Sequence, residues 1–443
     1  MHAAPLHHLR RFQHITYIDD FPDMSDLSIP AAGDADWWQS MPALQRVVSD
    51  LLAAELAQAR PGRAAPAQPW PRGLDFVRDL GADSLELLGM GTALAEALHL
   101  DRADVDARLL ARPCLDDWVE AAGAALRAGG GAGKMPLTFR TSGSSGSPKR
   151  CTHALATLWQ ETLALAQLLP RRRRILSLVP SHHIYGFLFT VLLPRALGIA
   201  DVLDLRSATP STVLREARPG DLVVAHPGWW EQAARLAPRF ADDVVGTTST
   251  APCPDPLAQA LADAGLRLLQ IYGSSETAGV GWRFAAGDAF SLLPWWSRSD
   301  SERELARSLP DGGTAAYPLQ DSLAWEDARR FRPLGRIDGA VQVGGVNVFP
   351  AYVAEVLCMH PKVAHASVRP MRPDEGRRLK AFVVPVAGAG AAGLDALQDA
   401  LREELLAWCA ERLGTAERPA AISFGERLPR QASGKPADWI IDA

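Results

Sequence analysis

The sequence predicts a multidomain chain with an N-terminal four-helix bundle, a layered α/β core and a small α+β unit at the C-terminus. Three observations indicate this organisation. Apolar residues recur with helical spacing up to about residue 128, short apolar strands then alternate with amphipathic helices, and beyond about residue 337 a helix, two strands and a long helix follow one another. With 443 residues, the chain is long enough for two or three domains that each have a core.

The N-terminal part divides into a tail and a bundle. Residues 1–36 lack apolar periodicity, and their histidines have no ligand spacing, so we expect a flexible tail. Over 37–128, helical stripes begin near Pro42, near Asp83 and Ser84, and near Leu115. A short helix opening at residue 101 completes the predicted four-helix bundle.

The core is predicted over 129–337 and the C-terminal unit over 338–443. A Gly-rich linker precedes the core. In the core we expect strands at 175–179, 221–225 and 266–271, and helices at 153–168 and 256–264. In the C-terminal unit we expect helices at 351–359 and 394–413, and strands at 363–368 and 379–386.

The bulk properties exclude several classes of function. A net charge of −5 and a pI near 6.1 argue against nucleic acid as a partner. The five cysteines are scattered, which suits a reducing compartment and neither a disulfide framework nor a zinc site. No apolar stretch is long enough to span a membrane, and no signal peptide is apparent. We therefore expect a cytoplasmic protein with no membrane partner.

The segment Thr141-Ser-Gly-Ser-Ser-Gly-Ser-Pro-Lys149 predicts a phosphate-binding loop. Two glycines and five hydroxyl side chains make poor helix or strand, whereas their backbone N–H groups can form an anion-binding nest. Lys149 adds a positive charge. A Ser/Gly linker is the alternative interpretation of this segment.

Two further segments carry chemistry. Val179-Pro-Ser-His-His183-Ile-Tyr-Gly186, taken alone, is typical of a strand-to-helix turn with core aromatics, whereas the family resemblance given below implies an acid-binding site. In that resemblance, the lack of a carboxylate to pair with an ammonium group implies a substrate acid without an α-amine. Ile271-Tyr-Gly-Ser-Ser-Glu276-Thr277 follows an expected strand and suits a nucleotide seat at the strand's carboxyl end.

Together with Leu334-Gly-Arg336-Ile-Asp338 and Ser433-Gly-Lys435, these segments resemble, in type and order, the adenylate-forming superfamily of acyl-CoA synthetases, luciferases and peptide-synthetase adenylation domains. The resemblance runs from about residue 137 to the end. It implies that ATP and Mg²⁺ are used and that the C-terminal unit is mobile about a hinge at Asp338. It implies catalytic roles for Lys435, His183 and Lys149, an acyl pocket at Tyr185 and Gly186, and a magnesium contact at Glu276. The nucleotide-binding residues that it implies are Thr141, Ser142, Gly143, Ser144, Ser145, Gly146, Tyr272, Gly273, Ser275, Thr277, Asp321 and Arg336.

The chain departs from the family pattern at three places. A long region that normally precedes the phosphate loop is absent, so residues 129–337 resemble a truncated large adenylation subdomain. Leu319-Gln-Asp321 stands where Thr-Gly-Asp is usual. Gln342 stands where the family often has a lysine that matters for thioester formation, which leaves the identity of the acceptor open.

The segment Asp79-Leu-Gly-Ala-Asp-Ser84-Leu resembles an acyl carrier protein, in which the serine receives 4′-phosphopantetheine. This resemblance implies a phosphopantetheinyl transferase and downstream acyl-processing enzymes as partners. The alternative is that Ser84 only caps its helix.

These features predict an ATP-dependent ligase that adenylates a carboxylic acid without an α-amine and transfers the acyl group to a phosphopantetheine thiol on its own carrier domain. The tryptophans and Tyr185 favour an aromatic acid. The alternatives are an ordinary acyl-CoA ligase and a non-catalytic nucleotide-binding scaffold whose carrier domain is loaded by another enzyme.

Lys435 is expected to stabilise the charge that develops as pyrophosphate leaves. Lys435→Ala should therefore lower acid-dependent ATP–pyrophosphate exchange by roughly 10²–10³-fold, the scale of losing one preorganised electrostatic contact. Near-normal exchange in a folded variant would remove Lys435 from catalysis.

Overall fold

The computed structural model describes residues 35–60, 67–100, 111–129, 135–141, 149–236, 239–344, 346–372, 374–386, 394–429 and 438–439. Residues 1–34 of the expected tail, and the short helix expected from residue 101, lie outside these ranges. Within them, no helix is both long and apolar enough to cross a membrane.

The N-terminal part contains a short 3₁₀ helix and three long helices in the described residues: η3 (Trp37–Gln39), α1 (Met41–Ala59), α2 (Ser84–Leu98) and α4 (Leu115–Ala128). The apolar stripe of α1 is buried, as its spacing predicts. Asp83 caps α2 by accepting the backbone N–H of Glu86, and the Glu86 side chain accepts the N–H of Asp83 in return. The helices pack around Phe76 and Trp118, whose rings lie 4.9 Å apart.

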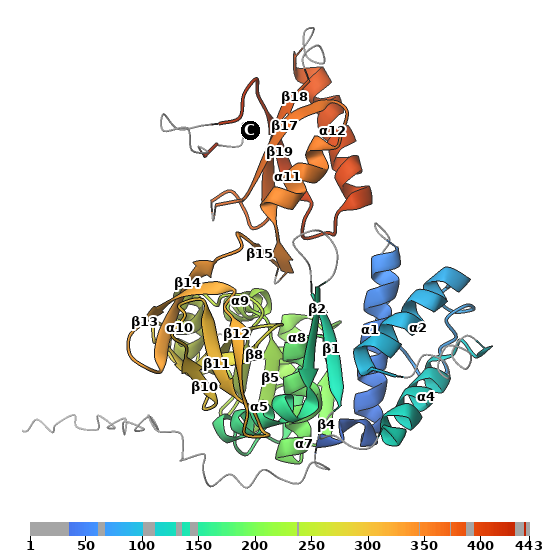
Figure 1. Ribbon diagram of the computed structural model, residues 1–443, viewed down its shortest axis with the longest axis vertical. Coiled ribbons are helices and arrows are strands. Elements are labelled where there is room, and N and C mark those ends of the chain that lie inside the picture. The colour runs from blue at the N-terminus through green and yellow to red at the C-terminus, as the bar shows by residue number, and fades with distance from the viewer. Residues whose placement is uncertain are drawn as a thin grey trace, which may run out of the picture.

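An antiparallel hairpin of β1 (Pro136–Thr141) and β2 (Lys149–Ala154) brackets the predicted phosphate loop. Figure 1 shows this hairpin between the N-terminal helices and the rest of the core. Leu137 and Phe139 on β1 are buried, so the hairpin contributes to the core as well as holding the loop.

A nine-stranded sheet forms the centre of the core, in the order β13-β14-β9-β8-β7-β6-β5-β3-β4. The first half in sequence is parallel, from β3 to β7, and the second half is antiparallel. The strands are β3 (Arg174–Ser177), β4 (Asp201–Asp204), β5 (Asp221–Ala225), β6 (Val245–Thr248), β7 (Arg267–Ser274), β8 (Ala278–Arg283), β9 (Phe290–Leu292), β13 (Asp321–Trp325) and β14 (Arg330–Arg336).

Helices and a small second sheet surround the large sheet. The helical elements are α5 (Leu155–Leu168), α6 (Ile184–Phe187), the π-helical turn η4 (Leu188–Leu192), α7 (Leu193–Leu197), α8 (Pro210–Glu216), α9 (Pro227–Leu236) and α10 (Asp255–Asp263). The second sheet contains β10 (Trp296–Arg298), β11 (Glu304–Ser308) and β12 (Thr314–Pro318). The alternation predicted from sequence therefore describes the parallel half, whereas the antiparallel half was not predicted.

The C-terminal unit stands apart from the sheet, above it in Figure 1. It contains β15 (Val341–Val343), β16 (Val346–Val348), α11 (Pro350–Cys358), β17 (Val363–Pro370), β18 (Leu379–Pro385), α12 (Leu394–Arg412) and β19 (Pro419–Phe424). Its apolar side chains form a cluster of their own. An ion pair between Arg377 and Glu231 of α9 connects it to the core. The bounds of α11, β17, β18 and α12 lie within one or two residues of those predicted from the sequence, whereas β15, β16 and β19 were not predicted.

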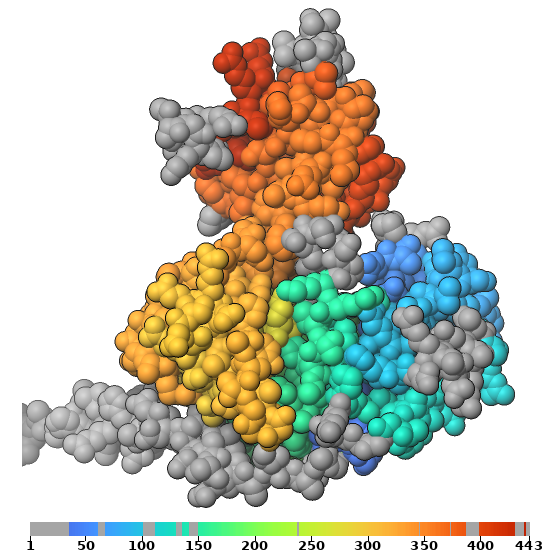
Figure 2. All heavy atoms as spheres, viewed as in Figure 1, coloured from blue at the N-terminus to red at the C-terminus, as the bar shows by residue number. Residues whose placement is uncertain are grey.

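The N-terminal helices and the α/β core share one hydrophobic cluster, although the sequence predicted them as separate domains. The cluster runs without a break from Leu44 of α1 through Phe139 of β1 to Leu222 of β5. Trp37 packs edge-on against Phe187 of α6 at 5.2 Å. The space-filling view shows the helices set directly against the hairpin (Figure 2). The bundle is thus built into the core rather than tethered to it.

Candidate active site

The carboxyl end of β7 carries the most concentrated group of predicted site residues. Lys149, the first residue of β2, donates to Glu276 across 2.6 Å between Nζ and Oε1. Burial acts to raise the pKa of Glu276, but the hydrogen bond and charge of Lys149 outweigh it, so the pKa lies below its ordinary value. Glu276 is therefore an anion at neutral pH.

A buried histidine connects the hairpin to the turn after β7. His153 on β2 is 5% exposed, and its Nε2 lies 2.7 Å from the carbonyl oxygen of Ser275. Burial lowers the pKa of this imidazole. A neutral ring that donates to the carbonyl holds the phosphate-loop hairpin and the Glu276 turn in a fixed relation.

The turn itself satisfies much of its own hydrogen bonding. Thr277 is buried, its hydroxyl donates to the carbonyl of Ala278 at 2.9 Å, and it accepts the backbone N–H of Ser274 at 3.0 Å. The sequence predicted that Thr277 contacts the nucleotide, whereas here its hydroxyl serves the turn. Gly273 is required by close approach, because a Cβ there would lie 2.0 Å from the carbonyl oxygen of Ala278.

Two buried charged residues support this turn from behind, and neither was identified from the sequence. Glu161 of α5 accepts the N–H of Gly279 at 2.9 Å, and Arg307 of β11 donates to the carbonyl of Thr277 at 3.2 Å. Both side chains are fully buried. Desolvation raises the pKa of Glu161 to about 7. The sequence did contain one signal of a buried charge, because Glu161 lies among apolar residues of α5.

The predicted ribose pair lies beside the same turn. Asp321 and Arg336 face each other in the register of β13 and β14, and the hydroxyl of Tyr272 donates to Asp321 Oδ2 at 2.9 Å. Burial, followed by the charge of Asp321, raises the pKa of Tyr272. Arg336 also holds Asp338, with 2.9 Å between Nε and Oδ1. Tyr272, Asp321 and Arg336 thus meet, although Leu319-Gln-Asp321 departs from the family pattern.

The His183 segment forms the start of α6. The ring of His183 lies 4.1 Å from that of His182 and is exposed. Tyr185 is buried and donates to the carbonyl of Ala225 at 3.1 Å, as in the alternative of a turn with core aromatics. Gly186 was predicted to give the substrate room, but the carbonyl oxygen of Pro180 would lie 2.0 Å from a Cβ at this position. The protein's own backbone therefore uses that space.

The adjacent tryptophans are core residues. Trp230 is fully buried and donates to the carbonyl of Thr247 at 3.0 Å, and Trp229 packs edge-on against it at 4.9 Å. Because both side chains are packed in the core, these two tryptophans give no support to the prediction of an aromatic acid.

Several predicted residues lie outside the described ranges, namely Ser142, Gly143, Ser144, Ser145, Gly146 and Lys435. Only the backbone of Thr141 is described. Near Lys435, Trp439 is docked on the C-terminal unit, because Arg369 donates to its carbonyl at 2.8 Å. Asp338 lies between β14 and β15, where a hinge was predicted, and Gln342 contacts Asn347 across β15 and β16.

No cluster of three or more His, Cys, Asp or Glu side chains in the described part of the chain is arranged to hold a metal ion. A cation at this site would have few protein ligands, as is usual for Mg²⁺ that arrives with a nucleotide. The ionised Glu276 fits such a contact.

Two family models cover most of the chain after the bundle. The model described as AMP-binding enzyme matches residues 137–353, and the model described as AMP-binding enzyme C-terminal domain matches residues 352–435. Their junction lies at the start of the C-terminal unit.

Curated relatives match over a longer range. A 4-coumarate–CoA ligase of Halorhodospira halophila is 38% identical over 88% of this chain and 97% of its own length. A 4-coumarate–CoA ligase of Cereibacter sphaeroides is 39% identical over 90% of this chain and 96% of its own length. These shares exceed the stretch from residue 137 to the C-terminus, so the matches include much of the N-terminal bundle.

Solved structures agree in fold. An amide bond synthetase from Marinactinospora thermotolerans superimposes with a TM-score of 0.55 at 21% identity, over 89% of this chain and 92% of that chain. An o-succinylbenzoate CoA synthetase from Bacillus subtilis gives a TM-score of 0.55 at 22% identity, over 68% of this chain and 67% of that chain.

The raised pKa of Glu161 predicts a pH dependence of stability. A carboxyl group whose folded pKa exceeds its ordinary value of 4.5 stabilises the fold below that value, and the contribution is lost as the pH rises through about 7. Glu161→Gln keeps an acceptor for Gly279 and cannot ionise. The parent should therefore lose stability relative to the variant as the pH rises from 5 to 8. The difference between their free energies of unfolding should decrease by on the order of 3 kcal/mol at most.

Urea unfolding at several pH values measures this difference. Glu302→Gln, at an exposed glutamate, is the matched control and should show no such trend. A pH-independent difference for Glu161→Gln would show that Glu161 ionises normally in the folded chain.

Proposed function

The chain belongs to the AMP-binding enzyme family, and we propose that it is an AMP-forming ligase that joins a hydroxycinnamic acid such as 4-coumarate to coenzyme A. The observation that carries the proposal is the match to relatives described as 4-coumarate–CoA ligase, at 38% and 39% identity over about nine tenths of the chain. This reading replaces the carrier-loading ligase as the preferred function.

The geometry around β7 supports the nucleotide half of the proposal. Tyr272, Asp321 and Arg336 combine an aromatic ring, a carboxylate and a guanidinium, a set that can hold a base and ribose hydroxyls. Glu276 and Lys149 lie at the adjoining turn, at the base of the predicted phosphate loop. When bound with ATP, Mg²⁺ would contact Glu276 and offset phosphate charge.

The chemistry explains why cationic groups are needed. An oxygen of the acid's carboxylate attacks the α-phosphorus of ATP, and the bond to the bridging oxygen breaks, so that pyrophosphate leaves and an acyl-adenylate forms. The two anions repel each other by roughly 4 kcal/mol per charge pair at about 4 Å and an effective dielectric near 20. Lys149 and Lys435 provide positive charge that offsets this repulsion. The thiol of coenzyme A then attacks the acyl carbon, loses its proton, and AMP leaves.

The charges near His183 support a substrate without an α-amine. Asp50 of α1 is the carboxylate that approaches this segment, and Arg206 and Ser181 already occupy its oxygens. An ammonium group would therefore find no unpaired carboxylate among the described residues of this segment. This matches 4-coumarate, which differs from tyrosine by the absence of the amine and the presence of a double bond.

Acid-dependent ATP–pyrophosphate exchange and thioester formation test the proposed function. With 4-coumarate, ATP, Mg²⁺ and coenzyme A, we expect the thioester and one AMP per thioester. Tyrosine, as the amine-bearing counterpart, should support neither reaction. Exchange with no acid of a hydroxycinnamate panel would contradict the proposal and favour the non-catalytic nucleotide-binding scaffold.

A second function, phosphopantetheine attachment at Ser84, is favoured by one specific observation. Ser84 is exposed at the first residue of α2, and the capping role belongs to Asp83 and Glu86. The alternative that Ser84 only caps its helix thus loses its basis. The packing of the bundle against the hairpin argues in the other direction, because a carrier domain normally moves between enzymes.

Intact mass after treatment with coenzyme A and a phosphopantetheinyl transferase tests the second function. We expect the added mass of one phosphopantetheine on the parent and none on Ser84→Ala, with thioester formation on free coenzyme A unchanged in the variant. If the parent gains no mass, the second function is excluded and only the acyl-CoA ligase function remains.

A further inference from the structure

Helix α1 presents two charged residues, one helical turn apart, to the α/β core. Arg46 and Asp50 are separated by four residues and so share one face of the helix. The Asp50 side chain is 1% exposed. A buried carboxylate is costly unless it is paired and hydrogen-bonded, so the contacts of Asp50 define what this face of α1 is built to hold.

Asp50 binds the residue that leads into the His183 segment. Its Oδ2 accepts the backbone N–H and the hydroxyl of Ser181, both at 2.7 Å. Its Oδ1 accepts Arg206 Nη2 at 2.6 Å. Ser181 is itself 1% exposed, so these bonds are shielded from water.

Arg46 binds the helical turn η4, which follows the His183 segment in the chain. Its Nη2 donates to the carbonyl of Thr190 at 2.6 Å. Thr190 lies in the π-helical turn η4, and its hydroxyl donates to the carbonyl of Gly186 at 2.7 Å. Arg46 and Asp50 therefore hold residues on either side of the stretch from His183 to Gly186.

Two arginines and two aspartates lie together around this contact, so their charges sum to zero. Asp50 and Asp204 face Arg206, and Arg46 lies within the same electrostatic group. His182 lies near Arg206, and His183 lies near the carboxylate of Asp50. Loss of Asp50 would leave two arginines with one carboxylate.

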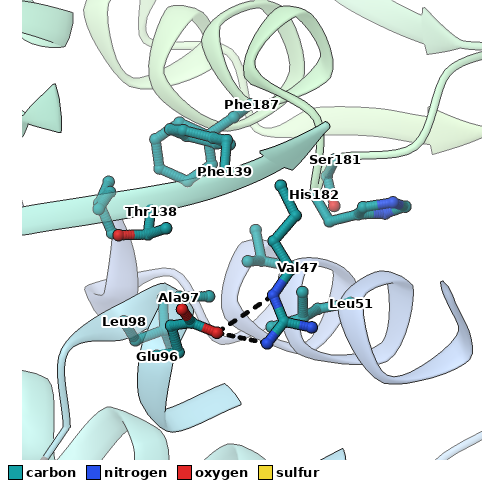
Figure 3. Close-up of a pocket in the computed structure, with 12 residues that line it drawn as sticks. Val47, Leu51, Glu96, Ala97, Leu98, Thr138, Phe139, Ser181, His182 and Phe187 are labelled. Carbon is teal, nitrogen blue, oxygen red and sulfur yellow. Dashed lines mark hydrogen bonds and ion pairs between the residues drawn. The ribbon is translucent and has the colours of Figure 1, made fainter. Parts of the chain in front are cut away.

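A second set of contacts joins the bundle to the base of the phosphate loop. Arg140 and Arg150 are paired across β1 and β2, and Glu96 of α2 holds both. Glu55 of α1 also accepts from Arg140 at 2.8 Å. The close-up shows Glu96 below the strand that carries Thr138 and Phe139 (Figure 3). Two active-site segments are thus attached to the bundle.

The cavity in Figure 3 does not explain these contacts. It lies between Val47 and Leu51 of α1 and Phe139, His182 and Phe187 of the core. Its volume is about 40 Å³, enough for a few water molecules and too small for an aromatic acid. This cavity is therefore not the acid site, and the contacts around it connect the bundle to segments of the core.

We propose that Asp50, assisted by Arg46, is a positioning residue that fixes the acid-binding segment around His183 from the N-terminal bundle. The inference rests on the proposed function for the identity of that segment. In this account the bundle supplies part of the ligase site in place of the absent region, whether or not Ser84 is modified.

Steady-state kinetics of Asp50→Asn test the proposal. The variant keeps the size of the side chain but loses its charge, and one of its two side-chain atoms becomes a donor that faces donors. We expect the KM for 4-coumarate to rise about tenfold or more, with the KM for ATP changed less than about twofold. Gln58→Ala, at an exposed position of α1, is the control and should change neither.

Ser181→Ala provides a milder variant if Asp50→Asn does not fold. It removes only the hydroxyl donor and should raise the acid KM in the same direction by a smaller factor. Equal increases in both KM values, or no change in the folded variants, would overturn the positioning role.

Hydrogen–deuterium exchange separates failure of this inference from failure of the proposed function, because it needs no substrate. In Asp50→Asn, peptides covering 181–192 should exchange faster than in the parent, while peptides covering 267–274 should not change. If the parent activates no acid but shows this pattern, the function is wrong and the contact stands. Unchanged exchange over 181–192 would overturn the contact.

Discussion

The burial of Asp50 is the constraint on which the arrangement of the N-terminal half depends. Its carboxylate is satisfied by Ser181 and Arg206, which belong to the α/β core, while Asp50 itself belongs to the bundle. These bonds form only when the two parts are in contact in this geometry, so they fix the orientation in which the bundle meets the core. The shared hydrophobic cluster acts in the same direction. The bundle is consequently part of the ligase body, a position that a carrier domain would have to leave in order to visit other enzymes.

Buried polar side chains also fix the backbone on the nucleotide side of the site. The turn that carries Glu276 is held from behind by Glu161 and Arg307, and from the hairpin by His153. In both places buried polar groups fix the backbone, while Lys149 and His183, which were expected to meet substrate, are exposed. Electrostatic catalysis requires such preorganisation, because a group that must reorient during the reaction loses much of its effect.

Sequence patterns predicted the elements whose signals are local. Strand 221–225 coincides with β5, and the C-terminal helices and strands lie close to their expected bounds, because apolar periodicity reports directly on burial. Tyr272, Asp321 and Arg336, which the sequence predicted to share a nucleotide site, lie together. The antiparallel half of the sheet was missed, since the turn after β7 returns as a hairpin where a helix would continue the alternation. Asp50, Glu161 and Arg307 were missed because the partners of a buried charge are distant in sequence. The space beside Gly186 and the place of the tryptophans depend on backbone approach and packing, which periodicity does not encode.

Native-state hydrogen exchange in increasing urea tests the central claim, that the bundle and the α/β core form one cooperative unit, most directly. Amides of α1 and of β5 are both buried in the shared cluster and would be followed together in the full chain. The account predicts that the slowest amides of both elements exchange with the same opening free energy and the same dependence on urea. A lower free energy for α1, with β5 still protected, would show that the bundle opens independently and would contradict the account.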